Sequence, residues 1–429
     1  MAARAKAAWG GRRPRKEAPA SLEYTLLYTA TLCMLAGGAV MVYSASSAES
    51  LLGGSGDPSY YLKRYVVFGV VGLALLHFLS RRGLSTVRAL TPVLLFAGFG
   101  LTLAVMLPGV GVELNGARRW LGAGPVQFQP AELLKLALVL YAVQLLAARP
   151  SVTRSLRRLA NPLLLIVGAA CVLLLAQPDM GTAIIVCLSI GSLLVVAGVP
   201  IRKLAIVVGG LVFVALLVAL AAPYRRARLT AFLDPWADPS GGGYQTVQAM
   251  IGIGSGGPFG VGLGESVQKI FYLPEAHTDM IVAIIGEETG VLGMAVLVAL
   301  FGMLAYGGLR TAKLAGDRYS KLLAAGLTSL ILCQAIVNLF AALGLAPLTG
   351  VPLPFISYGN SNMIIVLGAM GLLLNVAAQG GVRAGERPVS SGLRAIEGGA
   401  RSDAANRDRR RRDSGARRAG AGRRGRATG

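Results

Sequence analysis

Long apolar runs recur along the chain, and no other sequence feature constrains its fold as strongly. Each is about 20 residues long, the length that an α-helix needs to cross the hydrocarbon of a bilayer. Only 14% of the residues are charged, whereas soluble domains have about 25%. The short alternating segments typical of membrane β-barrels are not seen. The sequence therefore predicts an all-α polytopic membrane protein.

We expect ten spans, with a large external loop between the seventh and eighth. They cover residues 24–43, 62–80, 88–107, 131–148, 159–177, 181–199, 203–222, 280–308, 321–343 and 361–379. Because ten is an even number, both ends of the chain should lie on one side of the membrane. The expected domains are an N-terminal tail (1–23), a membrane domain (24–379) and a C-terminal tail (380–429).

Basic residues alternate from loop to loop, which predicts the orientation. One set of short loops holds them: Arg81, Arg82, Arg88, Arg149, Arg154, Arg157, Arg158, Arg202, Lys203, Arg310, Lys313, Arg318 and Lys321. The positive-inside rule puts this set and both basic tails in the cytoplasm. The external loops are then 44–61, 108–130, 177–180, 223–279 and 344–360. They carry most of the distinctive sequence, so we expect the chemistry at the outer face.

The net charge of +22 raises the question of a nucleic-acid partner. Anionic lipid headgroups lie closer to the basic run 409–412 than any nucleic acid would. We interpret the tails as topology signals and expect no nucleic acid. The cysteines lie inside apolar runs, which indicates small apolar side chains rather than a disulfide framework or a metal site: Cys33, Cys171, Cys187 and Cys333.

The second external loop combines a cationic cluster with an expected helix start: Arg118, Arg119, Trp120, Gln129 and Pro130. On that helix Glu132 and Lys135 share a face. Charges inside an apolar span are costly unless they are paired or functional. These two residues could form a self-satisfied ion pair, but we favour a role in binding a polar substrate.

Other external features are less specific. Asp179 is expected to cap the helix that follows it. The cations Arg225, Arg226 and Arg228 run against the positive-inside trend and suit either an anionic substrate or lipid headgroups. The glycine-rich stretch 251–264 lacks the ending and the preceding strand of a nucleotide P-loop. We therefore expect no nucleotide cofactor.

Charge concentrates between Gly260 and Gly290, beside membrane-grade apolar sequence: Glu265, Lys269, Glu275, His277, Asp279, Glu287 and Glu288. If the chain is extended there, Glu275, His277 and Asp279 point to one side. That spacing alone does not specify a metal site. Asp279 also stands where a helix begins, so it is either an N-cap or, as we favour, the main actor of an active centre.

Two further stretches shape this centre. The apolar run from Met280 to Leu309 would be about 45 Å long as a helix, against a hydrocarbon core of about 30 Å. We therefore expect its first turns to protrude or to line a watery cleft. The last external loop is rich in proline and glycine, which excludes helix. It is predicted to be an ordered re-entrant lid that offers Ser357 and Tyr358.

These residues resemble the SEDS family of bacterial cell-wall polymerases. The motifs cover nearly all of the membrane region: GARRWL (116–121), QPAELLK (129–135), QPDMGT (177–182), YLPEAHTD (272–279) and PLTGVPLPFISYG (347–359). The sequence around 268–288 is closer to the cell-division branch than to the elongation branch, and a sporulation-specific relative would look much the same. Met280 replaces a frequent phenylalanine, and Asn360 and Asn362 depart from the family's usual SYGGSS ending.

The resemblance implies a peptidoglycan glycosyltransferase that joins lipid II units at the outer face of the cytoplasmic membrane, at the division septum. It implies Asp279 as the catalytic residue. The implied partners are a class B penicillin-binding protein and other divisome proteins. The expected substrate-binding residues are Arg118, Arg119, Trp120, Gln129, Glu132, Lys135, Lys269, Glu275, His277 and Ser357.

One carboxylate can suffice for this chemistry, since a departing diphosphate needs no proton. A glycosidase needs two because its leaving alkoxide must be protonated. External cations, or a divalent ion such as Mg²⁺ or Mn²⁺, can stabilise the departing charge. Two alternatives remain open at this point. They are a lipid II flippase, which suits ten spans, and a non-enzymatic division scaffold.

Overall fold

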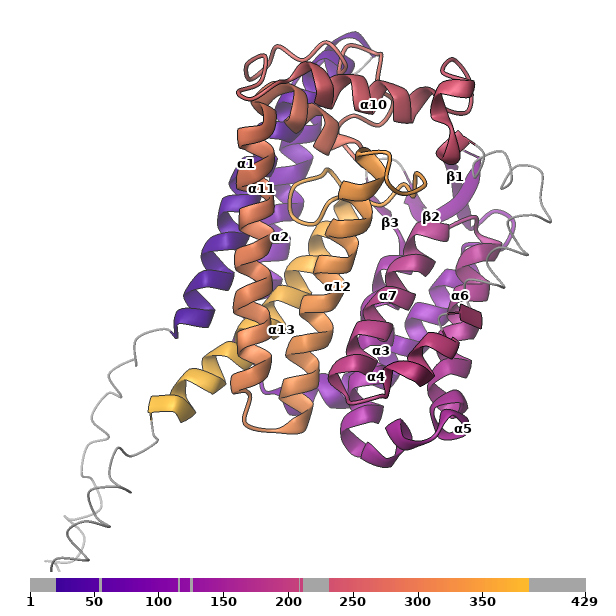
Figure 1. Ribbon diagram of the computed structural model, residues 1–429, viewed down its shortest axis with the longest axis vertical. Helices are drawn as coiled ribbons and strands as arrows, with labels where there is room; N and C mark the ends of the chain where they lie inside the picture. The colour runs from indigo at the N-terminus through magenta and orange to yellow at the C-terminus, as the bar shows by residue number, and fades with distance from the viewer. Residues whose placement is uncertain are drawn as a thin grey trace, which may run out of the picture. The chain divides into compact units, whose positions relative to one another are not determined.

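The computed structural model describes residues 21–53, 56–114, 116–123, 126–207, 209–210 and 231–385 (Figure 1). The chain divides into two compact units, Met1–Gly380 and Gly381–Gly429. The architecture described below is that of the first unit. The predicted tails lie mostly outside the described residues, and the domain boundaries stay predictions.

Helices dominate the described residues. The longer ones are α1 (Leu22–Leu52), α2 (Tyr60–Arg81), α3 (Leu84–Ala104), α4 (Pro130–Ala148), α6 (Leu165–Ala176), α7 (Met180–Val196), α10 (Tyr244–Ser255), α11 (Ile281–Leu314), α12 (Arg318–Ala342) and α13 (Asn360–Gly385). Short helical pieces are η2 (Pro150–Arg154), α5 (Leu156–Leu159), η3 (Ala160–Leu164) and η4 (Pro235–Ala237). Within this part of the chain, eight helical stretches are long and apolar enough to cross a membrane. The prediction of a polytopic helical membrane protein is confirmed.

The expected spans coincide with these helices, apart from the seventh. α7 fills the sixth expected span, although with 17 residues it is shorter than the eight helical stretches of spanning length. The seventh span, 203–222, lies largely outside the described residues, as do Arg225, Arg226 and Arg228. The count of ten therefore stays a prediction.

A small antiparallel sheet interrupts the helical architecture and was not predicted. It consists of β1 (Gly111–Leu114), β2 (Ala117–Ala123) and β3 (Val126–Phe128), in the order β1-β2-β3. It occupies the expected external loop 108–130. Gly116 has φ of 74° in the turn between β1 and β2, a conformation that glycine adopts without steric cost.

The start of α1 lies beside Ala377 of α13. Ser21 Oγ donates to the carbonyl of Ala377 at 3.4 Å. Loops of the basic set meet at this same end of the bundle, where Asn375 Nδ2 donates to the Leu79 carbonyl at 2.9 Å. The sheet and α10 lie at the opposite end, which is the upper end in Figure 1. The structure thus separates the two predicted sets of loops.

α11 is broken at Gly290, which has φ of 64° and ψ of −161°. The expectation that the first turns of this run protrude or line a watery cleft is wrong. Residues 281–288 are buried within the protein, with Glu287 and Glu288 only 3% and 1% exposed. The break divides the over-long run into a short buried helix, 281–289, and a separate stretch of spanning length.

Candidate active site

The 343–359 segment, which joins α12 to α13, is an ordered and largely buried element. Leu353, Phe355 and Ile356 are buried among the helices. The Ser357 hydroxyl accepts a hydrogen bond from the backbone N–H of Leu353 at 2.8 Å. Ser357, predicted to bind substrate, therefore closes a turn inside its own segment.

Asp279 lies directly beside this segment. It is half-buried, and one of its carboxylate oxygens would lie 3.9 Å from a Cβ placed on Gly350. Asn338 of α12 donates from Nδ2 to the carbonyls of Asp279 and Val351, both at 2.7 Å. A single buried amide thus fixes the Asp279 backbone against the 343–359 segment.

The N-cap hypothesis for Asp279 is not supported by the local geometry. The N-cap position of α11 is Met280, and its side chain makes no capping hydrogen bond. Asp279 lies one residue earlier. By contrast, Asp179 does cap its helix, because its carboxylate accepts from the Thr182 N–H at 3.2 Å. That part of the prediction is confirmed.

His277 is buried and ties three elements together. Its Nδ1 lies 3.2 Å from Oε2 of Glu49, near the end of α1. Its ring centroid is 4.2 Å from that of Tyr61 on α2, and its carbonyl accepts from the Tyr358 N–H at 3.0 Å. Burial raises the pKa of Tyr358 above its ordinary value, and the neighbouring Arg64 opposes that shift.

Two non-glycine residues near the site have left-handed backbone conformations. Glu275 has φ of 56° and Phe355 has φ of 66°. Such residues cost about 1–3 kcal/mol each and persist where the surroundings hold them. Thr278 Oγ1 donates to the exposed Glu275 carboxylate at 2.7 Å. This bond closes the turn that carries Asp279.

Glu132 and Lys135 form a buried ion pair beneath the 343–359 segment. Their charged atoms are 2.9 Å apart, and the side chains are 2% and 1% exposed. Lys135 Nζ also donates to Gln334 Oε1 at 2.6 Å. Gln334 in turn donates to the Pro352 carbonyl at 2.8 Å. The pair therefore supports the segment from below, while direct substrate contact stays a proposal.

The cationic cluster of the second external loop lies on the sheet. Arg118 is half-exposed and pairs with Glu113 across the β1–β2 turn at 3.0 Å. Arg119 Nε donates to the Gln177 carbonyl at 3.0 Å, and its guanidinium also donates to the Pro178 carbonyl. Trp120 is half-buried opposite Val112. The two arginines therefore differ in role: Arg118 pairs within the sheet, whereas Arg119 braces the α6–α7 turn.

Gln129 connects the sheet with α13 and α7. Its backbone N–H donates to Ser361 Oγ at 2.8 Å, and its side-chain amide donates to Asp179 at 3.4 Å. Asp179 is 2% exposed. The residue predicted to bind substrate therefore has partners within the protein on both its backbone and its side chain.

Lys269 belongs to a second buried cluster, around Glu287 and Glu288. Lys269 Nζ lies 2.8 Å from Glu288 Oε1, and Ser44 of α1 donates to the same carboxylate at 2.6 Å. Glu287 accepts from the Val267 N–H at 3.0 Å and from the Ser266 hydroxyl. These bonds hold residues 266–269 against α1 and α11.

No protein cage for a metal ion is formed by the described residues, since no three histidine, cysteine or carboxylate side chains among them group together. Glu275 is exposed, whereas His277 is buried against Glu49. The extended Glu–His–Asp arrangement considered from the sequence is not adopted.

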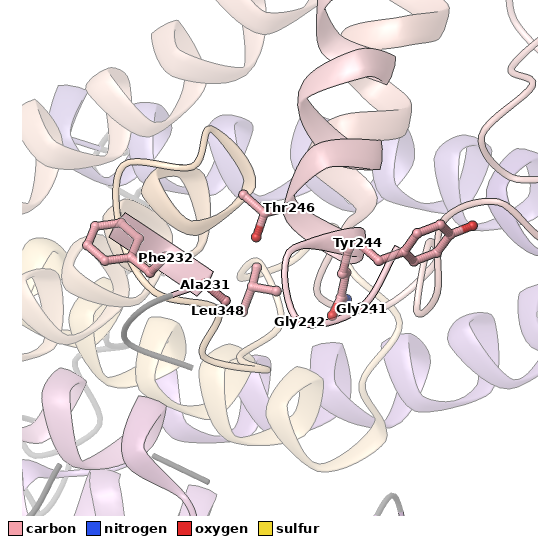
Figure 2. Close-up of a pocket in the computed structure, with 8 residues that line it drawn as sticks. Ala231, Phe232, Gly241, Gly242, Tyr244, Thr246 and Leu348 are labelled. Carbon is pink, nitrogen blue, oxygen red and sulfur yellow. The ribbon is translucent and has the colours of Figure 1, made fainter. Parts of the chain in front are cut away.

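A small hollow of about 220 Å³ opens between α10 and the 343–359 segment. Figure 2 shows Leu348 of that segment beside Ala231 and Gly242, with Thr246 of α10 close by. Asp279 is not among the described residues that line it. This hollow adjoins the segment that lies beside Asp279, so the two features share one structural element.

Sequence reasoning missed several residues that organise the site. Gln334 and Asn338 are four residues apart on α12, so they share a helical face, and both are almost fully buried. Two amides at this spacing inside an apolar run were a readable signal. Glu49 carried no comparable signal, because only the fold brings it to His277.

The chain matches a known family model along most of its length. The model describes cell cycle proteins of the FtsW, RodA and SpoVE type and matches residues 24–381. "Stage V sporulation protein E" of Bacillus subtilis is 39% identical over 354 residues, covering 82% of this chain and 96% of that protein. A protein of Thioalkalivibrio sulfidiphilus named "Probable peptidoglycan glycosyltransferase FtsW" is 42% identical over 357 residues, covering 82% and 88%.

Solved structures give the same relationship. A chain from a peptidoglycan synthase complex, studied for coordination of polymerization and crosslinking, has a TM-score of 0.68 and 32% identity and covers 82% of this chain and 97% of its own. The rod shape determining protein RodA of Thermus thermophilus has a TM-score of 0.60 and 30% identity, covering 82% and 95%.

Proposed function

The chain belongs to the SEDS family of FtsW, RodA and SpoVE proteins, and we propose that it is a peptidoglycan glycosyltransferase that polymerises lipid II into glycan strands. The observation that carries this proposal is its similarity, along nearly the whole membrane region, to relatives named probable peptidoglycan glycosyltransferases. It is a bacterial membrane protein of several spanning helices.

Asp279 acts as the base in this proposal. Its carboxylate takes the proton of the acceptor GlcNAc 4-hydroxyl as that oxygen attacks C1 of the donor MurNAc. The bond from C1 to the diphosphate oxygen breaks, undecaprenyl diphosphate leaves, and the centre is inverted. The half-buried position of Asp279 and its backbone anchor on Asn338 support this role, because a base must be held in reach of the proton that it removes.

We propose that some of the predicted substrate-binding residues contact the substrate directly and that others position the elements around it. Arg118 is half-exposed and can exchange Glu113 for a diphosphate oxygen. Trp120, Glu275, His277 and Ser357 belong to the outer end of the molecule or to the segments around Asp279. Arg119, Gln129, Glu132, Lys135 and Lys269 have partners within the protein. They act by positioning these elements or by exchanging partners when substrate binds.

A divalent cation stays a proposal as well. Mg²⁺ is commonly bound by one or two carboxylates together with substrate phosphates. Asp279 and the diphosphate would be such a set, whereas the described residues offer no cage. When bound, the ion would neutralise charge on the leaving diphosphate.

The proposed partner is a class B penicillin-binding protein, which would crosslink the strands, within a division complex at the septum. The similarity to a chain from a polymerising and crosslinking complex supports this assembly. Both termini are proposed to be cytoplasmic, which puts Asp279 at the outer face.

The experiment is reconstitution of the purified full chain, with and without its partner, in liposomes containing lipid II. Glycan polymer resolved on a gel is the expected product. Transfer of fluorescent lipid II between leaflets without polymer would instead establish a flippase. Neither activity, with the partner bound, would leave a scaffold and overturn the proposal.

A further inference from the structure

The glycine-rich segment 256–263, which follows α10, supplies backbone hydrogen-bond partners at the break in α11. In an unbroken helix the N–H groups after Gly290 would bond to carbonyls one turn earlier. Instead, four backbone hydrogen bonds join the segment to the helix: Val291 N to Gly257 O at 3.0 Å, Leu292 N to Pro258 O at 3.1 Å, Val261 N to Glu287 O at 3.0 Å, and Gly262 N to Glu288 O at 3.1 Å.

The contact is one of backbone against backbone. A Cβ added to Gly260 would meet the Glu288 carbonyl, and one added to Gly290 would meet the Gly260 nitrogen. A Cβ on Gly256 would likewise meet the Gly286 carbonyl. Glycine at these positions lets the two strands of chain approach closely enough to exchange hydrogen bonds.

The apolar side chains of segment 256–263, and those of α11 just after the break, are exposed. Phe259, Val261 and Leu263 are 80%, 46% and 62% exposed, and Val291 and Leu292 on the joined helix are 67% and 59% exposed. The hydrogen bonds make these residues neighbours. Exposed apolar side chains are therefore present on both partners of this backbone contact, the segment and α11.

The length of α11 sets the depth of these side chains. From Val291 to Leu309 the helix rises about 28 Å, close to the thickness of about 30 Å for the hydrocarbon core. Arg310, which pairs with Glu23 at 2.6 Å, marks one boundary of the core. The other boundary then falls at Gly290, level with the segment. The exposed Glu265 follows two residues after Leu263, and a charge at that position suits the headgroup region.

We propose that segment 256–263 is embedded at the edge of the bilayer, with Phe259, Val261 and Leu263 contacting the acyl chains of the leaflet nearest α10. Hydrocarbon offers no hydrogen bonds, so backbone groups there must find partners in the protein. Eight backbone groups at the break have such partners. A surface exposed to water would not need this internal pairing, because water can bond to backbone groups. The pairing therefore favours lipid as the occupant.

The test measures depth and needs no substrate. Native cysteines are replaced by alanine, and a nitroxide is attached at Phe259→Cys, Leu263→Cys, Val296→Cys or Ser240→Cys. Val296 is an exposed residue of the spanning part of α11, and Ser240 lies in an exposed polar turn. The full chain is placed in nanodiscs of phosphatidylethanolamine and phosphatidylglycerol without a partner. Power-saturation EPR spectroscopy then compares how often each nitroxide collides with oxygen and with a water-soluble nickel chelate.

We expect labels at 259 and 263 to resemble 296, with oxygen collisions exceeding those of nickel several-fold, and the label at 240 to show the reverse. Nickel accessibility at 259 and 263 equal to that at 240 would overturn the proposal. Low accessibility to both reagents would also overturn it, and would indicate a second copy of the chain as the occupant. Two independent label positions guard against a local distortion at either one.

Discussion

The backbone of Asp279, the proposed catalytic base, is fixed by a hydrogen bond. Its carbonyl is held by Asn338, which holds Val351 with the same nitrogen. The backbone bonds thus help to place the carboxylate, which also accepts a hydrogen bond from Thr278 Oγ1 at 3.4 Å. Substitutions of the side chain should change chemistry without moving the backbone.

Asp279→Asn should abolish polymerisation while leaving thermal stability and partner binding unchanged. General-base catalysis contributes about 10²–10⁴-fold in rate, and asparagine retains the size but not the basicity. Lipid II polymerisation and the midpoint of thermal unfolding are the measurements. Asp57→Asn, at an exposed external acid paired with Lys63, is the matched control. Near wild-type polymerisation by Asp279→Asn would remove Asp279 from the mechanism.

Lys135→Met should destabilise the protein by about 3–5 kcal/mol, because it leaves the buried Glu132 carboxylate without its partner. The double variant Lys135→Met with Glu132→Gln should recover most of that loss. Unfolding in detergent measures both. If the double variant is stable but no longer uses lipid II, Lys135 contacts substrate. If it is stable and active, the pair only supports the 343–359 segment.

At the scale of elements, the decisive contacts are made by segments without regular structure. The 343–359 segment is held from α12 and α4, and the 256–263 segment completes α11. The sheet is braced against the α6–α7 turn by Arg119. Helices therefore supply the frame, and irregular segments pinned to them supply the site.

Gly290→Ala should cost about 1–3 kcal/mol, since its backbone conformation is one that essentially only glycine adopts. A Cβ there would also meet the backbone of segment 256–263. Gly302→Ala is the control. It lies on the same helix with nothing within 4 Å of an added Cβ, and alanine is the better helix former there. Thermal unfolding should separate the two variants clearly; equal stability would contradict the role given to the break.

Arg119→Ala should lower the unfolding midpoint, because it releases two carbonyls of the α6–α7 turn. Arg118→Ala should change stability little, since exposed ion pairs contribute little. If both guanidinium groups contact the diphosphate, both variants should also raise KM for lipid II. Wild-type kinetics in both would remove them from the substrate site.

At the scale of the whole molecule, charge and topology agree. The start of α1 meets Ala377 of α13 at one end of the bundle, together with basic loops. Asp279, α10 and the sheet belong to the other end. The positive-inside rule predicts that the basic end faces the cytoplasm.

A cysteine introduced at Ser414, in a background without native cysteines, should therefore resist an impermeant thiol reagent in intact cells. Ser240→Cys, in an exposed turn before α10, should react. Labelling is read by mass shift before and after permeabilisation. Reaction at 414 in intact cells would reverse the orientation and put Asp279 on the wrong face for lipid II.

Sequence alone determined the helical membrane class and the span positions in the described residues, and it predicted which loops carry the candidate site. These depend on local properties, namely the length of an apolar run, the chemistry of proline and glycine, and the side-chain cap of Asp179. Neighbouring residues suffice to specify them. The family motifs added the expectation of Asp279.

Only the tertiary structure decided which polar groups satisfy one another. Glu49 meets His277 across more than two hundred residues, Lys135 meets Gln334, and segment 256–263 meets the break at Gly290. The over-long apolar run gave no sign that it divides at a glycine, because an apolar pattern is the same for one helix and for two. Such pairings depend on which surfaces pack together, and a buried polar group must find its partner wherever packing puts one.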